Sequence, residues 1–370
     1  MKTKFTSESI SRTTESTMHQ LSPYLGRLPS SLARGLICEF SNQGETILDP
    51  YCGSGVIPFE ATLLGRNAVA FDLNPYALLL TKAKLSAPLK KEVAVKKVNY
   101  YLDLVNNRLL YYQPNGAPSW VKQFFHKRTF AEIQLLTEIL NENNEYFLLA
   151  CLLGILHHER PGFLSFPASH FAPYLRTKKY PKSDFPEMYK YKDVRSRLIA
   201  KVERAYKRYD EKKAGKCKVI ERDCCDTKLK ASSIDLVCTS PPYYGILDYG
   251  RDNRLRLWFL GINEHEKLDK VLCHKSGEYF NHIKNMLVEM LRVLKLNHYC
   301  VLVLGNIVKN GNRRDLARDV MEIALGIEIN KQKYQFIEIR DEEIPETRRS
   351  VKRNKNTLVE RVLILQKKTK

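Results

Sequence analysis

Short apolar runs alternate with longer amphipathic segments along most of the chain. Five runs are rich in aliphatic and β-branched residues, and we predict them to be buried strands: 45–48, 67–71, 218–222, 234–238 and 298–304. Segments 334–340 and 358–365 have a similar composition and predict a closing antiparallel hairpin. Because helical patterns follow the first two strands, the chain begins as a doubly wound α/β sheet.

The spacing of apolar residues also predicts the helices. We expect them at 30–40, 56–64, from 76 onward, 131–156, 192–213 and 279–294. The stretch from 87 to 215 separates the second strand from the third, and it is too long for a simple crossover. We therefore divide the chain into residues 1–86, an inserted and mostly helical region at 87–215, and residues 216–370.

A glycine-containing turn joins the first strand to its helix. It reads Asp49-Pro50-Tyr51-Cys52-Gly53-Ser54-Gly55. Glycine is needed where the backbone takes a positive φ or approaches a ligand closely. The turn is neither G-x-G-x-x-G nor a phosphate loop, since it lacks the lysine. An acidic residue opens it, which suits a ligand that carries an ammonium and a sulfonium.

Acidic residues also follow the second and third strands. Asp72 ends the second strand, where a carboxylate can accept hydrogen bonds from both hydroxyls of a ribose. Asn74 is expected to cap the following helix, with Pro75 in its first position. Asp223 ends the third strand, and Asp226 competes with it for the same role.

The fourth strand runs directly into Thr239-Ser240-Pro241-Pro242-Tyr243. Two consecutive prolines fix φ and remove two backbone donors, so the strand must end in a rigid, extended turn. Such a turn displays carbonyl groups, a hydroxyl and an aromatic face. This set is suited to holding a planar base and accepting hydrogen bonds from its amino group.

The two motifs together resemble the S-adenosylmethionine-dependent amino-methyltransferases of DNA, whose catalytic loop is Asp/Asn/Ser-Pro-Pro-Tyr/Phe. The resemblance covers 17–86 and 216–366 and implies a class I methyltransferase fold, a Rossmann-like seven-stranded α/β sheet with a large insertion. Residues 1–86 would then bind cofactor, 87–215 would recognise the target, and 216–370 would form the catalytic half. The implied S-adenosylmethionine contacts are Tyr24, Asp49, Pro50, Cys52, Gly53, Gly55, Asp72, Asn74, Asp223 and Thr239, and the implied catalytic residues are Ser240, Pro241, Pro242 and Tyr243.

The loop sequence bears on the target atom. Relatives with serine before Pro-Pro mostly modify cytosine N4, and those with aspartate or asparagine mostly modify adenine N6, so we expect cytosine N4. The motif order, with the cofactor turn first, is shared with a subgroup in which Asp-Pro-Pro-Tyr is frequent, which keeps adenine N6 open. Methylation at cytosine carbon-5 would need a cysteine after proline, and the sequence has no Pro-Cys pair. We therefore expect direct transfer to a flipped-out base.

Charge points to a polyanionic partner. The net charge is +20, and between 176 and 213 there are fourteen Lys and Arg against six Asp and Glu, interleaved with tyrosines. A merely solvated basic surface is the alternative. Arg251, Arg254 and Arg256 follow the catalytic loop, where they could contact phosphates or pair with nearby acids. The expected DNA contacts are Lys178, Lys179, Arg195, Arg197, Arg251, Arg254 and Arg256.

Composition limits the remaining possibilities. No apolar run is long enough for a membrane span, and residues 1–5 are polar, so we expect a cytoplasmic protein. The nine cysteines form no C-x-x-C pair, and we expect free thiols and no metal, His157-His158-Glu159 being the densest ligand cluster. An RNA substrate and a non-catalytic nucleic-acid-binding fold stay open as alternatives. A partner restriction endonuclease is possible, and the sequence does not give the oligomeric state.

Overall fold

The computed structural model of the 370-residue chain describes most of the sequence. The described residues are 15–114, 116–170, 172–209, 213–242, 249–272, 276–305, 307–309, 312–343 and 359–370. Tyr243, predicted to be catalytic, lies outside these ranges.

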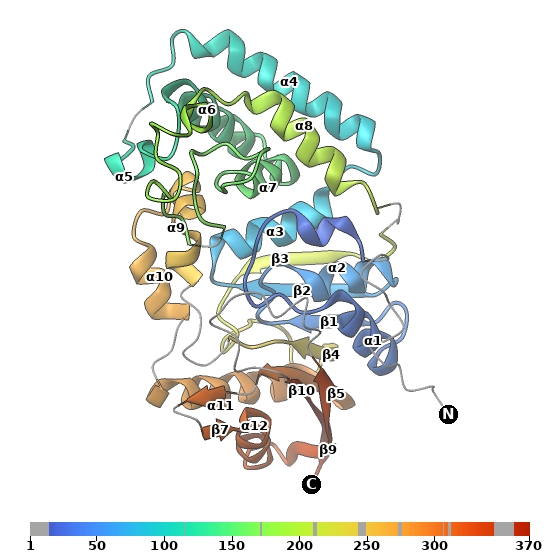
Figure 1. Cartoon of the computed structure of the whole chain (residues 1–370). Helices are drawn as coiled ribbons and strands as arrows, with labels where there is room; N and C mark the ends of the chain where they lie inside the picture. The colour runs from blue at the N-terminus through green and yellow to red at the C-terminus, as the bar shows by residue number, and fades with distance from the viewer. Residues whose placement is uncertain are drawn as a thin grey trace.

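One mixed sheet of eight strands organises the molecule, in the order β3-β2-β1-β4-β5-β10-β9-β8 (Figure 1). Strands β3, β2, β1, β4 and β5 are parallel, whereas β10 runs antiparallel to β5 and β9. The strands are β1 (Thr46–Asp49), β2 (Asn67–Asp72), β3 (Cys217–Glu221), β4 (Ile234–Thr239), β5 (Leu294–Gly305), β8 (Glu328–Ile329), β9 (Gln332–Glu343) and β10 (Val359–Thr369). All seven expected strands are present, and β8 adds a two-residue edge. A separate ribbon pairs β6 (Ile307–Lys309) with β7 (Asn312–Arg314).

Helices cover both faces of the sheet because successive strand residues point to opposite sides. Ile47 packs in a core cluster with α1 (Ser30–Phe40) and α2 (Val56–Leu63). Its neighbour Leu48 packs in another cluster with α11 (Ser276–Val293) and α12 (Leu316–Leu325). The parallel strands are thus buried on both faces, as their nearly continuous apolar sequences predict.

The inserted region is a layer of helices beyond α3 (Pro75–Ser86), at the top of Figure 1. It contains α4 (Lys91–Leu109), α5 (Ser119–Lys122), α6 (Lys127–Glu142), α7 (Tyr146–Gly154), η3 (Pro186–Tyr189) and α8 (Val194–Ala205). The prediction of one helix over 131–156 was wrong, because Asn144 takes a left-handed φ of 55° and separates α6 from α7. The expected helix 192–213 is also shorter, since α8 ends at Ala205.

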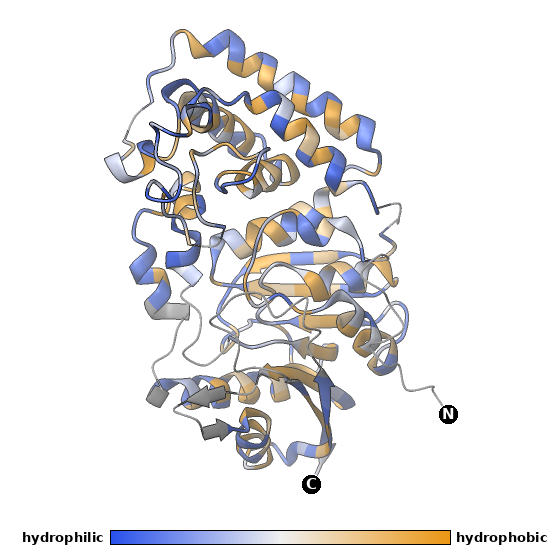
Figure 2. Ribbon diagram, viewed as in Figure 1, coloured by the Kyte–Doolittle hydropathy of each residue, from blue (hydrophilic) through white to orange (hydrophobic). Residues whose placement is uncertain are grey.

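The insertion shares its hydrophobic core with the segment after the catalytic loop. Leu255, Leu257 and Phe259 of α9 (Tyr249–Phe259) belong to the same buried cluster as the apolar residues of α6 and α7. Helix α10 (His265–Leu272) follows α9. On the outside, α4 and α8 alternate between hydrophobic and hydrophilic residues (Figure 2). Among the described residues, no helix combines the length and the apolar character that crossing a membrane requires.

Candidate active site

Two glycines have different structural roles in the turn after β1. Gly53 has a φ of 48°, and its backbone N–H donates to Asp72 Oδ2 at 2.8 Å. Gly55 has a φ of 74° and begins α2. A Cβ on Gly55 would lie 2.5 Å from Thr81 Oγ1 and 2.8 Å from Thr81 Cα. Gly55 therefore allows α2 and α3 to approach closely, while Gly53 shapes the turn itself.

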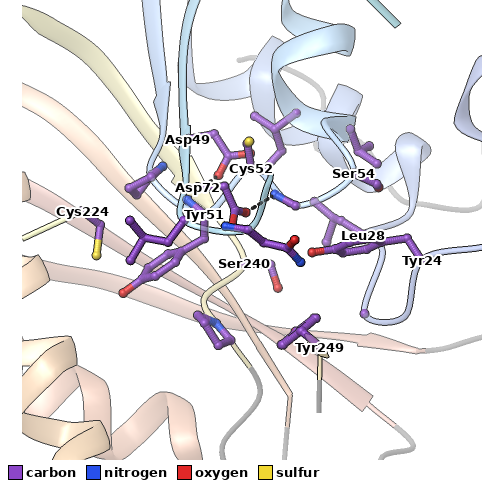
Figure 3. A pocket seen from close by; sticks show the side chains of 18 of the residues that line it. Tyr24, Leu28, Asp49, Tyr51, Cys52, Ser54, Asp72, Cys224, Ser240 and Tyr249 are labelled. Atoms are coloured by element: carbon purple, nitrogen blue, oxygen red, sulfur yellow. Dashed lines mark hydrogen bonds between the residues drawn. The ribbon is translucent and has the colours of Figure 1, made fainter. Parts of the chain in front are cut away.

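Asp72 lies in the middle of the pocket formed beside this turn (Figure 3). Its carboxylate accepts hydrogen bonds from the backbone N–H groups of Gly53 and Asn74, both at 2.8 Å. Desolvation by the surrounding protein raises the pKa of Asp72 to about 6. Asn74 in turn caps α3 by accepting from the N–H of Tyr76 at 3.0 Å, as the sequence predicts. The acid at the end of β2 is therefore fixed in orientation before any ligand arrives.

Asp49 connects the cofactor turn to the catalytic loop. Thr239 at the end of β4 donates its hydroxyl to Asp49 Oδ1 at 2.7 Å, and the backbone N–H of Tyr51 donates to the same oxygen at 3.3 Å. Burial raises the pKa of Asp49 to about 7. Since β1 and β4 are adjacent parallel strands, this bond holds the two motifs side by side.

The loop after β4 enters the same pocket. Ser240 donates its hydroxyl to the carbonyl oxygen of Val303 on β5 at 3.1 Å. Ser240 and Pro242 line the pocket, whereas Pro241 is buried beside them. Because the proton of Ser240 is directed at Val303, the lone pairs of its oxygen are left to accept a hydrogen bond.

The pocket lies at the carboxyl ends of β1, β2 and β4, where the strand order reverses. Ligands of open α/β sheets bind at this switch point. Its empty volume is about 870 Å³, open solvent included. The predicted site residues that line it are Tyr24, Asp49, Pro50, Cys52, Gly53, Asp72, Asn74, Asp223, Ser240 and Pro242. The other described site residues do not line the pocket but adjoin residues that do: Gly55, Thr239 and Pro241.

The pocket also contains residues that the sequence analysis missed. Tyr249 of α9 lies with its ring centroid 6.1 Å from that of Tyr24. Tyr51 Oη lies 2.6 Å from His282 Nε2, and both residues line the pocket with Cys224. Tyr51 and Cys224 adjoin predicted residues, so proximity in sequence could have found them. His282 and Tyr249 reach the pocket from distant helices and have no local signal.

The two candidate acids after the third strand lie in different places. Asp223 lines the pocket and accepts from the N–H of Cys225 at 2.8 Å. Asp226 instead forms an exposed ion pair with Lys228 at 2.7 Å. Asp223 is thus placed to face a ligand and Asp226 is not.

The predicted DNA contacts are distributed unevenly. The prediction that Arg256 contacts DNA was wrong. Arg256 is only 1% exposed, and it donates to the Leu153 carbonyl at 3.2 Å and to Asn253 Oδ1 at 3.2 Å. Its guanidinium, over the ring of Tyr76, is not accessible to a phosphate. Arg254 is half-buried, donating to the Pro173 carbonyl and stacking on Trp120.

The remaining cations fall into two groups. In α8, Arg195 bonds to Asp103 at 2.6 Å and Arg197 to the Asp193 carbonyl at 3.0 Å. By contrast, Lys178 is exposed, and Lys179 is exposed with Glu159 at 3.6 Å. The Arg251 side chain is 40% exposed, with Asp252 at 3.8 Å. Among the predicted DNA contacts, the most accessible charges are therefore those of Lys178, Lys179 and Arg251.

The residues present fit S-adenosylmethionine. Gly53 leaves space beside Tyr24, since a Cβ there would lie 3.3 Å from the tyrosine ring. Asp72 and Asp49 offer carboxylates to ribose hydroxyls and to a cationic amino-acid end. The strand order and the pocket at its switch point are those that the resemblance to class I, S-adenosylmethionine-dependent methyltransferases predicts.

Comparison with known proteins narrows the class. The family model N6_N4_Mtase, described as DNA methylase, matches residues 2–83. The type II methyltransferase M.MjaII of Methanocaldococcus jannaschii is 26% identical over 106 residues, covering 29% of this chain and 19% of that protein. The type II methyltransferase M.HpaI of Haemophilus parainfluenzae is 31% identical over 65 residues, covering 18% and 21% respectively. Parts of this chain are therefore similar to DNA methyltransferases.

The extent of these similarities is limited. The matched region spans about a fifth of the length of the two relatives, 19% and 21%. Among solved structures, TrmN from Thermus thermophilus aligns with 95% of this chain and 52% of its own, at 12% identity and a TM-score of 0.38. A similarity this low adds nothing to the topology described above.

Proposed function

We propose that this protein transfers a methyl group from S-adenosylmethionine to the exocyclic amino group of a base in DNA, with cytosine N4 as the target. One observation carries the proposal: Ser240 and Pro242 line the same pocket as Asp49, Gly53 and Asp72. A base held by the catalytic loop would therefore meet a cofactor held by the turn after β1. The family match over 2–83 and the names of the DNA-modifying relatives support the same activity.

The catalytic loop would act on the nucleophile. The lone pair of an exocyclic amine is delocalised into the ring, so the amine must be polarised before it attacks. Ser240 has its own proton directed at the Val303 carbonyl, which leaves its oxygen to accept one amino hydrogen. The backbone carbonyl of Ser240 or Pro241 would accept the other. These bonds strengthen as positive charge develops on the nitrogen, which is where they lower the barrier.

The cofactor side would orient the electrophile. When bound, S-adenosylmethionine supplies a methyl group on a positively charged sulfur. Asp72 would accept hydrogen bonds from the ribose, and Asp223 would face the adenine amino group. Asp49 is fixed by Thr239, so it would hold the cationic end at a set distance from the loop. Holding both reactants in this way removes much of the entropic barrier to direct transfer.

DNA would approach across the basic side of the insertion. Lys178 and Lys179 are exposed there, and Arg251 lies two residues into α9, beyond the catalytic loop. These side chains would contact phosphates, while Tyr243 would stack on the flipped base, a role that rests on the family resemblance. Arg195, Arg197 and Arg254 are bonded within the protein and would contribute mainly to the general field. The type II relatives make a partner endonuclease a further part of this proposal.

Nucleoside mass spectrometry of DNA from cells that express the protein tests the proposal. A matched culture expresses Ser240→Ala with Pro242→Ala. We expect N4-methylcytosine in the first culture and its loss in the second. N6-methyladenine in its place would overturn the choice of base but keep the reaction. If neither appears although the purified chain binds S-adenosylmethionine, DNA is the wrong substrate and RNA is tested next; absence of cofactor binding would favour the non-catalytic alternative.

A further inference from the structure

A cluster of two thiols and an imidazole lies at the edge of the cofactor pocket. Cys224 and Cys225 follow Asp223 in the loop after β3, and His282 lies on α11. Cys224 Sγ is 3.9 Å from Cys225 Sγ and 3.6 Å from His282 Nε2, and Cys225 Sγ is 3.7 Å from His282 Nδ1. One ligand atom from each of the three residues lies within 4.8 Å of the others. Cys225 and His282 are 57 positions apart in the sequence, so the fold alone assembles this group.

Two of the distances between these side-chain atoms match the distances between ligands in a tetrahedral zinc site. A tetrahedral Zn²⁺ with Zn–S of about 2.3 Å and Zn–N of about 2.05 Å places its sulfur ligands about 3.8 Å apart and sulfur and nitrogen about 3.6 Å apart. The observed 3.9 Å between the sulfurs and 3.6 Å between Cys224 Sγ and His282 Nε2 differ from these separations by about a tenth of an ångström or less. The 3.7 Å of Cys225 Sγ is to the other ring nitrogen, Nδ1, so Cys225 or the imidazole must rotate for both sulfurs to share one nitrogen's ion. Thiolate and imidazole are also the donors that select zinc over magnesium or calcium. Small rotations of the side chains would bring the three groups around one ion.

We propose that Cys224, Cys225 and His282 form a Zn²⁺ site whose occupation excludes S-adenosylmethionine. Three protein ligands leave a fourth tetrahedral position for water. Cys224 and His282 both line the cofactor pocket, so an ion with its water would stand in the pocket itself. On binding, the thiols release their protons to solvent and become thiolates. The metal site rests on the cluster alone, whereas the exclusion rests on the proposed cofactor site.

Two contacts transmit the effect to the cofactor residues. The Cys224 thiol donates to Asp223 Oδ1 at 3.6 Å, and this bond is lost when the thiol proton leaves. His282 Nε2 lies 2.6 Å from Tyr51 Oη, within the turn that would hold the cofactor. Coordination through this nitrogen would take it away from Tyr51. Zinc would therefore disturb both Asp223 and Tyr51 in addition to filling space.

The first test is zinc binding by the full chain after removal of metals with a chelator. We expect one zinc per chain for the unaltered protein and for Cys38→Ser, whose half-buried thiol lies on α1. Cys225→Ser and His282→Ala should lose this zinc. With Co²⁺ as the probe, the thiolate-to-metal absorption band should appear in the first pair and vanish in the second. Unchanged zinc binding in Cys225→Ser and His282→Ala would overturn the site.

The second test measures S-adenosylmethionine binding with and without zinc. At zinc concentrations about ten times its own Kd, competition should raise the apparent Kd for S-adenosylmethionine about tenfold. Cys225→Ser should bind S-adenosylmethionine without zinc, which shows that it is folded, and should not respond to zinc. Zinc binding without any S-adenosylmethionine binding would keep the metal site and overturn the proposed function. S-adenosylmethionine binding that ignores bound zinc would overturn the exclusion and keep the proposed function.

Discussion

Charged side chains are held differently at the carboxyl ends of β1 and β2 than in the helices of the insertion. Asp49 and Asp72 are bonded to backbone N–H groups and a hydroxyl, and among the described residues no cation lies directly against them; desolvation raises the pKa of both. In the insertion, Arg195 bonds to Asp103 and Arg176 to Glu159. The carboxylates of the pocket can thus still bind a positively charged ligand, whereas many charged side chains of the insertion are paired with one another. Net charge alone therefore overstates how many cations are available to DNA.

The largest expected effect is on the free energy of unfolding, and it comes from comparing one glycine of the turn after β1 with one glycine of the insertion. Gly55→Ala should lower the free energy of unfolding by about 3 kcal/mol, because a positive φ and a clash with the Thr81 backbone act together. Gly116→Ala in the insertion also has a positive φ, of 70°, but nothing lies within 4 Å of its added Cβ. Gly116→Ala should therefore lower the free energy of unfolding by only about 1 kcal/mol. Urea denaturation measures both; equal losses would contradict the close approach of α2 and α3.

Removing one carboxylate from each region sharpens the comparison. Asp72→Asn should weaken S-adenosylmethionine binding about 100-fold, or about 2.7 kcal/mol, since it loses charge-assisted bonds to the ribose. Asp103→Asn on α4 makes the same chemical change at a carboxylate that pairs with Arg195 and lies outside the pocket. It should leave the affinity unchanged. Isothermal titration calorimetry distinguishes them, and a tight Asp72→Asn complex would remove Asp72 from the cofactor site.

The raised pKa of Asp72 predicts a pH dependence. Only the ionised carboxylate accepts the ribose bonds, so the titration of Asp72 alone should lower the affinity for S-adenosylmethionine about tenfold from pH 7.5 to 5, through the pKa of about 6. The effect on folding has the opposite sign. Because the pKa of Asp72 in the folded state is above the ordinary 3.8, protonation of this carboxylate favours the folded state. This contribution to stability is complete below pH 3.8 and is lost as the pH rises through about 6. Unfolding and binding measured at both pH values check the two signs. Burial also raises the pKa of Asp49, to about 7, so Asp72→Asn should reduce each difference and leave the part that comes from Asp49.

The smallest effect concerns single cations of the insertion. Lys178→Ala should weaken DNA binding a few-fold and reduce the slope of log affinity against log salt by about 0.9, the value for one phosphate contact. Arg195→Ala removes the same charge, but its guanidinium is bonded to Asp103 and Asn99. It should change the slope less and cost stability of up to about 1 kcal/mol. Identical slopes for the two variants would show that only the total charge matters.

The parts that could be predicted from sequence are those that local rules determine. The strand before Asp49, the acid Asp72 and the Asn74 cap follow from residues within one strand–turn–helix unit, and the structure has them as expected. The break at Asn144 depends on a left-handed residue that periodicity does not register. The burial of Arg256 and the meeting of Cys224 with His282 depend on how distant helices pack. No pattern along the chain carries that information.

The central claim is that one pocket holds the cofactor on the β1–β2 side and the target base on the β4 side. The most direct test measures S-adenosylmethionine binding and methyl transfer to DNA in parallel for Ser240→Ala, with Ser183→Ala in the insertion as the control. The account predicts that Ser240→Ala binds the cofactor normally and transfers about 100-fold more slowly, while Ser183→Ala does both like the unaltered protein. Normal transfer by Ser240→Ala, or loss of cofactor binding together with transfer, would contradict it.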